Sequence, residues 1–89
     1  MYHFRDLQCF VTVYEQRSFS RAAAVLDTVQ SQVSARIKRL EDSTEAQLFV
    51  RLHRGIVPTP KGELMYQHAK RVLSDVAALE SAAKMNDAA

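Results

Sequence analysis

Polar and basic side chains are gathered between Gln30 and Leu40, where the sequence has three basic residues and no acidic one. Glutamine pairs with the edge of adenine, serine donates or accepts a hydrogen bond, and lysine or arginine binds guanine or a phosphate. These residue types therefore suit contact with a nucleic acid. The alternative is a solvated helix face, which has the same composition, and only the absence of acidic residues argues against it.

The same segment has the period of an amphipathic helix from about Gln30 to Asp42, with Val33, Ile37 and Leu40 on one apolar face. At about 100° per residue, the polar side chains lie on the opposite face and its shoulders. A helix that enters a DNA groove presents its first residues to the bases. The candidate contact residues of this helix are Gln30, Ser31, Gln32, Ser34, Ala35, Arg36, Lys38 and Arg39.

Two further helices are predicted before this segment. An apolar stripe predicts a first helix that ends near Arg17, its members being Phe4, Leu7, Phe10, Val11 and Tyr14. A second helix is predicted over about residues 21–26, with Ser20 as its N-cap. Residues 27–29 separate it from the polar helix, and two helices joined by so short a turn are typical of a helix-turn-helix. An αα-hairpin of a small bundle has the same spacing and remains an alternative.

The chain changes character after the polar helix. Residues 49–51 and 56–58 are short extended candidates that predict a small hairpin, or wing. Arg51 and Arg54 bracket its tip, and an arginine there can follow a DNA backbone or enter a narrow minor groove. Both could equally be surface charges paired with an acidic residue.

A long helix is predicted after the wing. Thr59 is its N-cap, Pro60 is its first residue, and it can run to about Lys84. Its apolar residues recur at steps of four and three, the period of a coiled coil, so that a second copy of the helix is expected to cover them and form a homodimer. The predicted dimerisation residues are Met65, Ala69, Val72, Val76, Leu79 and Ala83.

Length and composition bound the class of protein. An 89-residue chain forms one small domain, and its two glycines and two prolines leave little room for loops, so we expect a mainly α fold. The single cysteine, Cys9, excludes an internal disulfide and is predicted to be a core residue. No segment has the length and apolarity of a membrane span or a signal peptide, which predicts a soluble, cytoplasmic protein without a membrane partner.

Motifs of catalysis are missing from the sequence. It has no glycine-rich phosphate loop, no G-x-S-x-G turn and no spaced carboxylate pair, so we expect neither enzymatic activity nor a cofactor. His3, His53 and His68 have no ligand spacing with one another or with Cys9, and no metal site is predicted. Two alternatives to specific DNA binding remain: a protein-interaction module built on the long helix, and a winged helix that binds DNA without sequence preference.

Six short motifs, in their order and spacing, resemble the N-terminal domain of LysR-type transcriptional regulators over about residues 4–80. They are Phe10-x-x-Val13, Ser18-Phe19-Ser20-x-Ala22-Ala23-x-x-Leu26, Gln30-Ser31-x-Val33-Ser34-x-x-Ile37, Leu40-Glu41, Leu48-Phe49-x-Arg51 and Thr59-x-x-Gly62. The combined pattern is highly specific, whereas each piece alone is not.

The resemblance implies a winged helix-turn-helix, a three-helix core with a two-stranded wing, in residues 1–58. It implies a linker helix in residues 59–85 that pairs between subunits, and leaves 86–89 as a disordered tail. Such proteins bind double-stranded promoter DNA, form tetramers at full length and sense a small-molecule inducer through a separate effector domain, which we expect to be missing here. The implied base-reading residues are Gln30, Ser31, Gln32, Ser34 and Ala35, with Arg54 as the wing contact.

Several positions depart from the family's pattern. Ala35 stands where the family often has arginine or another long polar residue, which predicts an altered or relaxed base preference. Arg36 projects about 60° from the apolar centre and cannot replace it, so either a phosphate contact or an intramolecular pair is expected. Glu45 stands at a helix end where glycine is common, at a cost of about 1 kcal/mol if the left-handed backbone persists. Val29 replaces a capping residue and leaves Thr28 as the substitute.

Overall fold

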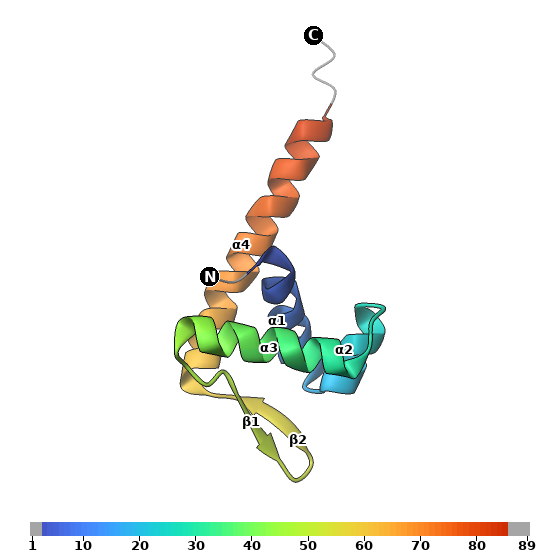
Figure 1. Cartoon of the computed structure of the whole chain (residues 1–89). Coiled ribbons are helices and arrows are strands. Elements are labelled where there is room, and N and C mark those ends of the chain that lie inside the picture. Colours follow the sequence, from blue (N-terminus) through green and yellow to red (C-terminus); the bar gives the residue numbers. More distant parts are fainter. Residues whose placement is uncertain (1–2, 86–89) are drawn as a thin grey trace.

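The computed structural model describes residues 3–85, which form four helices and one antiparallel hairpin (Figure 1). In chain order the elements are α1 (Phe4–Gln16), α2 (Phe19–Val25), α3 (Gln30–Thr44), β1 (Phe49–Leu52), β2 (Gly55–Pro58) and α4 (Pro60–Lys84). The predicted mainly α fold, with a helix-turn-helix, a wing and a long last helix, is therefore confirmed. The tail predicted at 86–89 lies outside the described residues.

The core lies between α1, α2, α3 and the wing. Phe10 and Val13 of α1 and Leu40 of α3 have fully buried side chains, and Cys9 is buried beside them as predicted. The rings of Phe10 and Phe49 lie 5.4 Å apart between centroids, which ties β1 to α1. Burial of one such side chain stabilises the fold by about 1.5–3 kcal/mol. This packing holds α3 against α1 and leaves the opposite face of α3 outward.

α2 begins two residues earlier than the sequence predicted. The N-cap is Ser18 rather than Ser20, because the Ser18 hydroxyl accepts a hydrogen bond of 3.1 Å from the amide of Arg21. Phe19 is consequently the first residue of the helix and is buried in the core. Residues 26–29 join α2 to α3 and complete the helix-turn-helix.

Both ends of α3 lack the usual capping residue. Val29 is the N-cap in extended backbone, and no side chain binds the first amides, so Thr28 does not act as the expected substitute. The helix continues to Thr44, two residues further than predicted, because the amides of Glu45 and Ala46 still bind carbonyls of the last turn. Glu45 has left-handed backbone angles, φ 51° and ψ 39°, at a cost of about 1 kcal/mol relative to glycine.

The wing is anchored at both of its ends. One carboxylate oxygen of Glu41 accepts hydrogen bonds from the amides of Leu48, at 2.8 Å, and Phe49, at 3.4 Å, which joins α3 to β1. The first turn of α4 lies so close to the chain before β1 that a side chain at Gly62 would collide with the Leu48 carbonyl oxygen. In the hairpin, the paired residues are Phe49 with Pro58, Val50 with Val57, Arg51 with Ile56 and Leu52 with Gly55.

α4 is capped as predicted and is braced against α1. The Thr59 hydroxyl accepts a hydrogen bond of 3.0 Å from the Gly62 amide. The rings of Tyr14 and Tyr66 are stacked, with centroids 3.6 Å apart. Tyr66 donates a hydrogen bond of 2.6 Å to Glu15, while other pairs across the two helices join Tyr14 to Glu63 and Lys70 to Glu15. These contacts fix the direction in which α4 leaves the core.

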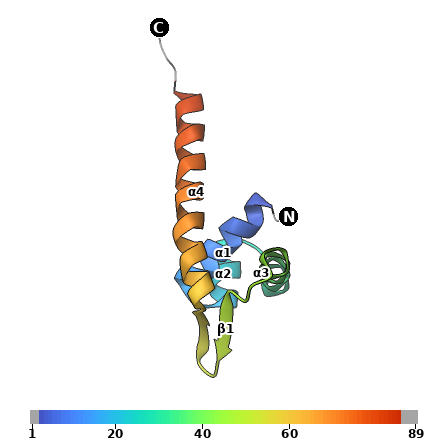
Figure 2. The ribbon, with the colours of Figure 1, turned by 90° about the vertical axis from the view of Figure 1, so that its left-hand side faces the viewer.

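The second half of α4 projects beyond the other elements, as the side view shows (Figure 2). The wing lies at the opposite end of the molecule from the end of α4. No helix within residues 3–85 combines the length and apolarity needed to cross a membrane.

Candidate nucleic-acid interface

The polar face of α3 is directed outward and toward the wing. Gln30 lines a hollow beside the hairpin, and Ser34 and Lys38, one and two turns further on, line a second one. Ser31 and Ala35 are exposed on the outward face. These five predicted contact residues therefore form one continuous surface along the helix.

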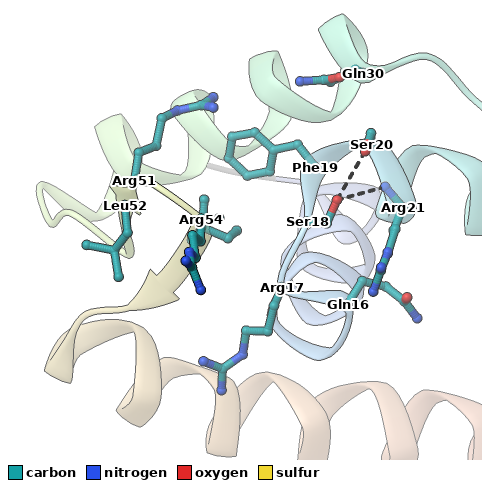
Figure 3. Close-up of a pocket in the computed structure, with 12 residues that line it drawn as sticks. Gln16, Arg17, Ser18, Phe19, Ser20, Arg21, Gln30, Arg51, Leu52 and Arg54 are labelled. Atoms are coloured by element: carbon teal, nitrogen blue, oxygen red, sulfur yellow. Dashed lines mark hydrogen bonds between the residues drawn. The ribbon is translucent and has the colours of Figure 1, made fainter.

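A hollow of about 600 Å³ lies between the start of α2, the start of α3 and the wing (Figure 3). Arg51 and Arg54 line it from the wing, and Arg17 and Arg21 line it from the junction of α1 and α2, with the Arg17 side chain directed toward α4. None of its lining residues is acidic. Within residues 3–85, none of the four arginines has a carboxylate within 4.0 Å. The hollow, which we call the wing groove, therefore has uncompensated positive charge.

Aromatic rings lie beneath two of these arginines, and the guanidinium carbon of Arg17 lies 4.7 Å from the centroid of the Tyr14 ring. The guanidinium carbon of Arg51 lies 4.5 Å from the centroid of the Phe19 ring, a cation–π contact that fixes direction without neutralising charge. Phe19 in turn packs edge-on against Phe49 in the core. Arg51 also lines the second hollow, of about 470 Å³, together with Ser34 and Lys38. It therefore lies between the wing and the polar face of α3.

The sequence pointed to Arg51 and Arg54 but not to Arg17 and Arg21. Arg17 ends α1 in left-handed backbone (φ 56°), and its Nε donates a hydrogen bond of 2.8 Å to the carbonyl of Tyr14. Arg21 follows the N-cap of α2 by three residues. The available signal was a pair of basic residues four positions apart that flank the start of a helix.

Arg36 and Arg39 point the other way, toward α1, where both bind Asp6. Arg39 donates from Nε to Oδ2 and from Nη2 to Oδ1, each at 3.0 Å, and Nη1 of Arg36 donates to Oδ1 at 3.3 Å. The backbone amide of His3 adds a further hydrogen bond of 3.3 Å. For Arg36 the structure thus forms the intramolecular pair that was one of its two expected roles. Gln32, the remaining predicted contact, is exposed.

Asp6 was not among the residues selected from the sequence. Its side chain is 0% exposed, and the hydrogen bonds from Arg39, opposed by burial, hold the pKa of its carboxyl below the usual 3.8. The carboxylate is therefore ionised at neutral pH. Its arginine partners are 30 and 33 residues away, so local spacing did not indicate the ion pairs, and only its bond to the His3 amide, three residues away, is a local helix-start contact.

The predicted dimerisation seam is divided by the fold. Met65 packs against the core and Ala69 is 3% exposed, because α1 of the same chain covers this end of α4. Both residues were assigned to contact with a second chain, yet neither needs one to be covered. The remaining seam residues are exposed or partly exposed: Val72, Val76, Leu79 and Ala83.

Known proteins share both the sequence pattern and the fold. The family model described as "Bacterial regulatory helix-turn-helix protein, lysR family" matches residues 4–63. The HTH-type transcriptional regulator CzcR of Bacillus subtilis (strain 168) is 42% identical over 76 residues, which are 85% of this chain and 26% of that protein. This chain thus spans about a quarter of the length of the CzcR regulator.

Two solved structures extend the likeness to the wing and α4. The BenM_DBD/catB site 1 DNA complex has a TM-score of 0.89 at 38% identity and matches over 92% of each chain. The CbnR_DBD–DNA complex has a TM-score of 0.87 at 28% identity over 92% of this chain and 94% of that one. Since the family model alone covers well over half of the sequence, this chain belongs to the lysR family of bacterial regulatory helix-turn-helix proteins.

Proposed function

We propose that this chain is the DNA-binding domain of a LysR-type transcriptional regulator and that it binds double-stranded DNA with sequence preference. The observation that carries the proposal is the continuous polar face of α3 beside the wing groove, whose arginines have no carboxylate partner among residues 3–85. The DNA complexes of BenM_DBD and CbnR_DBD, which have the same fold, support it.

In this proposal α3 enters the major groove and presents its first turns to the bases. Gln30, Ser31, Gln32 and Ser34 supply donors and acceptors for base edges. Ala35 offers only a methyl group, which can contact the methyl of thymine but cannot discriminate by hydrogen bonding. We therefore expect weaker preference at the base pair facing Ala35 than at the one facing Gln30.

The wing groove supplies the contacts that do not depend on sequence. Arg17, Arg21 and Arg51 are placed to bind phosphates, and Arg54 at the wing tip to bind a phosphate or enter the minor groove. Lys38 adds a charge on the polar face of α3, where its side chain is 77% exposed. Each phosphate contact releases counterions, so binding weakens steeply with salt.

A homodimer through α4 would place two copies of α3 on one face of the duplex. Val72 and Leu79, 44% and 68% exposed on the projecting half of the helix, supply an unpaired apolar stripe. Two-fold symmetry then predicts an inverted repeat with half-sites about 34–36 Å apart. Sedimentation tests this arrangement: Leu79→Glu should give a monomer, and Glu80→Gln, the adjacent control, should remain a dimer.

The deciding experiment is selection of bound sequences from a random DNA pool at about 150 mM salt, followed by titration of the selected site against scrambled DNA. An enriched inverted repeat supports specific recognition by a dimer. Salt-sensitive binding without enrichment would support the alternative of a non-specific winged-helix protein. Absence of binding to any duplex would contradict the proposed function.

Two variants divide base recognition from phosphate contact. Gln30→Ala should cost about 1–3 kcal/mol on the selected site and relax preference at one base pair. Lys38→Ala should weaken binding to all sequences alike and lower the salt slope by about one. Equal losses on every sequence for both variants would contradict the assignment of Gln30 to a base.

The biological role of the domain follows from this proposal. A bacterial regulator acts on promoter DNA in the cytoplasm, and the site preferred by α3 determines which genes it reaches. Tetramer formation and the response to a small-molecule inducer would require parts of a parent protein beyond residues 3–85.

A further inference from the structure

The basic side chains of α3 have different surroundings on the side facing the wing and on the side facing α1. On the wing side, Lys38 is 77% exposed, and its contact with Asp42 is a solvent-exposed pair at 3.7 Å. On the α1 side, Arg36 and Arg39 have side chains only 26% and 47% exposed, and both bind the Asp6 carboxylate. Two of the three cations of the proposed recognition helix therefore share one buried carboxylate of this chain.

The Asp6 carboxylate offers these arginines what a DNA phosphate would offer. Arg39 binds both of its oxygens through two hydrogen bonds of 3.0 Å, the two-pronged geometry that arginine uses for carboxylates and phosphates alike. A guanidinium engaged in this way has two of its five N–H donors directed at α1. Arg36 completes the arrangement from one turn earlier on the same helix.

Departure of the arginines toward DNA would be strongly opposed. Asp6 has no exposed surface, and a buried carboxylate that loses its cationic partners is among the least favourable groups in a protein. A phosphate on the duplex surface, already solvated and surrounded by counterions, offers no comparable gain. The ion pairs should therefore persist when DNA binds.

Resting on the proposed function, we propose that Asp6 is a positioning residue that limits sequence-independent binding, because it holds Arg36 and Arg39 against α1 and keeps both off the DNA phosphates. Recognition by α3 then depends on its outward and wing-facing residues. The positive charge available for sequence-independent attraction then comes mainly from the wing groove.

The test is the salt dependence of DNA binding, measured on the selected site and on scrambled DNA. Asp6→Asn keeps the shape of the side chain but removes its charge and frees the two arginines. We expect the salt slope on scrambled DNA to steepen by about one to two, because each new phosphate contact contributes about 0.9. The affinity for scrambled DNA should rise about tenfold at about 150 mM salt, and the affinity for the selected site should rise alike, because phosphate contacts do not depend on sequence. Asp42→Asn, a matched change that frees only the exposed Lys38, should leave the salt slope and both affinities unchanged.

A second variant separates this role from a merely structural one. The triple variant Asp6→Asn, Arg36→Gln, Arg39→Gln removes the freed charges and should restore the wild-type salt slope. If the triple variant instead has a slope lower than wild type by about two, the arginines contact phosphates in the native protein and the proposal is overturned. Should neither variant fold, Arg36→Gln alone, which leaves Asp6 bound to Arg39, tests the same point. Its salt slope should equal that of the wild type if Arg36 contacts no phosphate, and should be lower by about one if it does.

The outcomes also separate this inference from the proposed function. Wild-type protein that binds no duplex contradicts DNA binding itself. Wild-type protein that binds specifically, with Asp6→Asn showing an unchanged salt slope and an unchanged affinity for scrambled DNA, contradicts only the role of Asp6.

Discussion

Arginines are gathered at two places on this domain, and their surroundings differ. In the wing groove, the four lining arginines face solvent, and within residues 3–85 no carboxylate lies within 4.0 Å of any of them. At the α1 side of α3, Arg36 and Arg39 share one carboxylate that has no exposed surface. The same residue type is therefore available to a partner in one place and committed to the fold in the other.

The difference shows why charge along a sequence is an incomplete guide to a nucleic-acid interface. The segment from Gln30 to Leu40 has three cations and no acidic residue, yet two of these cations are paired with Asp6, far earlier in the chain. Uncompensated charge is found instead on elements that flank this segment. Each of the following variants measures one side of this contrast.

The largest expected effect is on folding stability. Asp6→Ala should lower the free energy of unfolding by about 3 kcal/mol, the low end for removal of one member of a buried pair, since its arginines are partly hydrated. Arg54→Ala in the wing groove should change it by less than about 0.5 kcal/mol, because no partner is lost. Urea unfolding of both variants measures this difference. Equal losses of unfolding free energy would contradict the distinction between the two groups of arginines.

The order of the two groups reverses when DNA affinity is measured, because loss of a wing-groove arginine then has the larger effect. Arg54→Ala should weaken binding about fivefold at about 150 mM salt on the selected site and on scrambled DNA alike, and should lower the salt slope by about one, which is one lost phosphate contact. Arg5→Ala, a cation on the first turn of α1 outside the wing groove, serves as the matched control. A loss confined to the selected site would instead assign Arg54 to base or groove-width recognition.

Most of the fold could be predicted because local patterns specified it. The apolar residues Val33, Ile37 and Leu40 repeat with the period of a helix, and all three are buried in α3. The N-cap Thr59 and the N1 residue Pro60 likewise defined the start of α4. Errors arose where two similar residues competed, as at the start of α2.

The candidate site was less predictable, because its charges are decided by contacts distant in the sequence. A helical wheel gives the direction of Arg39 but not the presence of Asp6 opposite it, 33 residues away. The same limit applies to the seam on α4, since the contact of Ala69 with the core depends on how α1 crosses it. Periodicity predicted an apolar stripe but could not assign its parts to one chain or two.

Acid should weaken the ion pairs of Asp6 with Arg36 and Arg39. It should leave the arginines of the wing groove unaffected. Because Arg39 lowers the folded-state pKa of Asp6 beneath 3.8, its contribution to stability is complete above the unfolded pKa and is lost as pH falls through the lower folded value. Glu15, whose pKa is lowered by its hydrogen bonds to Lys70 and Tyr66, adds to the same acid loss.

Urea midpoints measured from about pH 5 to about pH 2 should therefore fall less steeply for Asp6→Asn than for the wild type. Arg54→Ala, which changes no carboxylate partner, should follow the wild-type curve. If the urea midpoints of Asp6→Asn fell with pH as steeply as those of the wild type, the ion pairs of Asp6 would contribute nothing to folding stability.

The smallest expected effect belongs to the pair of Lys38 with Asp42, in which a cation of α3 has an acidic partner that is exposed rather than buried. The two side chains are 77% and 67% exposed, and their charged atoms are 3.7 Å apart at a spacing of one helical turn. Pairs of this kind contribute about 0.3–0.5 kcal/mol, so Asp42→Asn should lower the free energy of unfolding by no more than that. Urea unfolding at low and high salt measures it, since screening should abolish the difference. A loss of unfolding free energy above about 1 kcal/mol that persists at high salt would mean that this exposed pair behaves like the buried Asp6 cluster. The exposure of a pair on α3 would then not determine its strength.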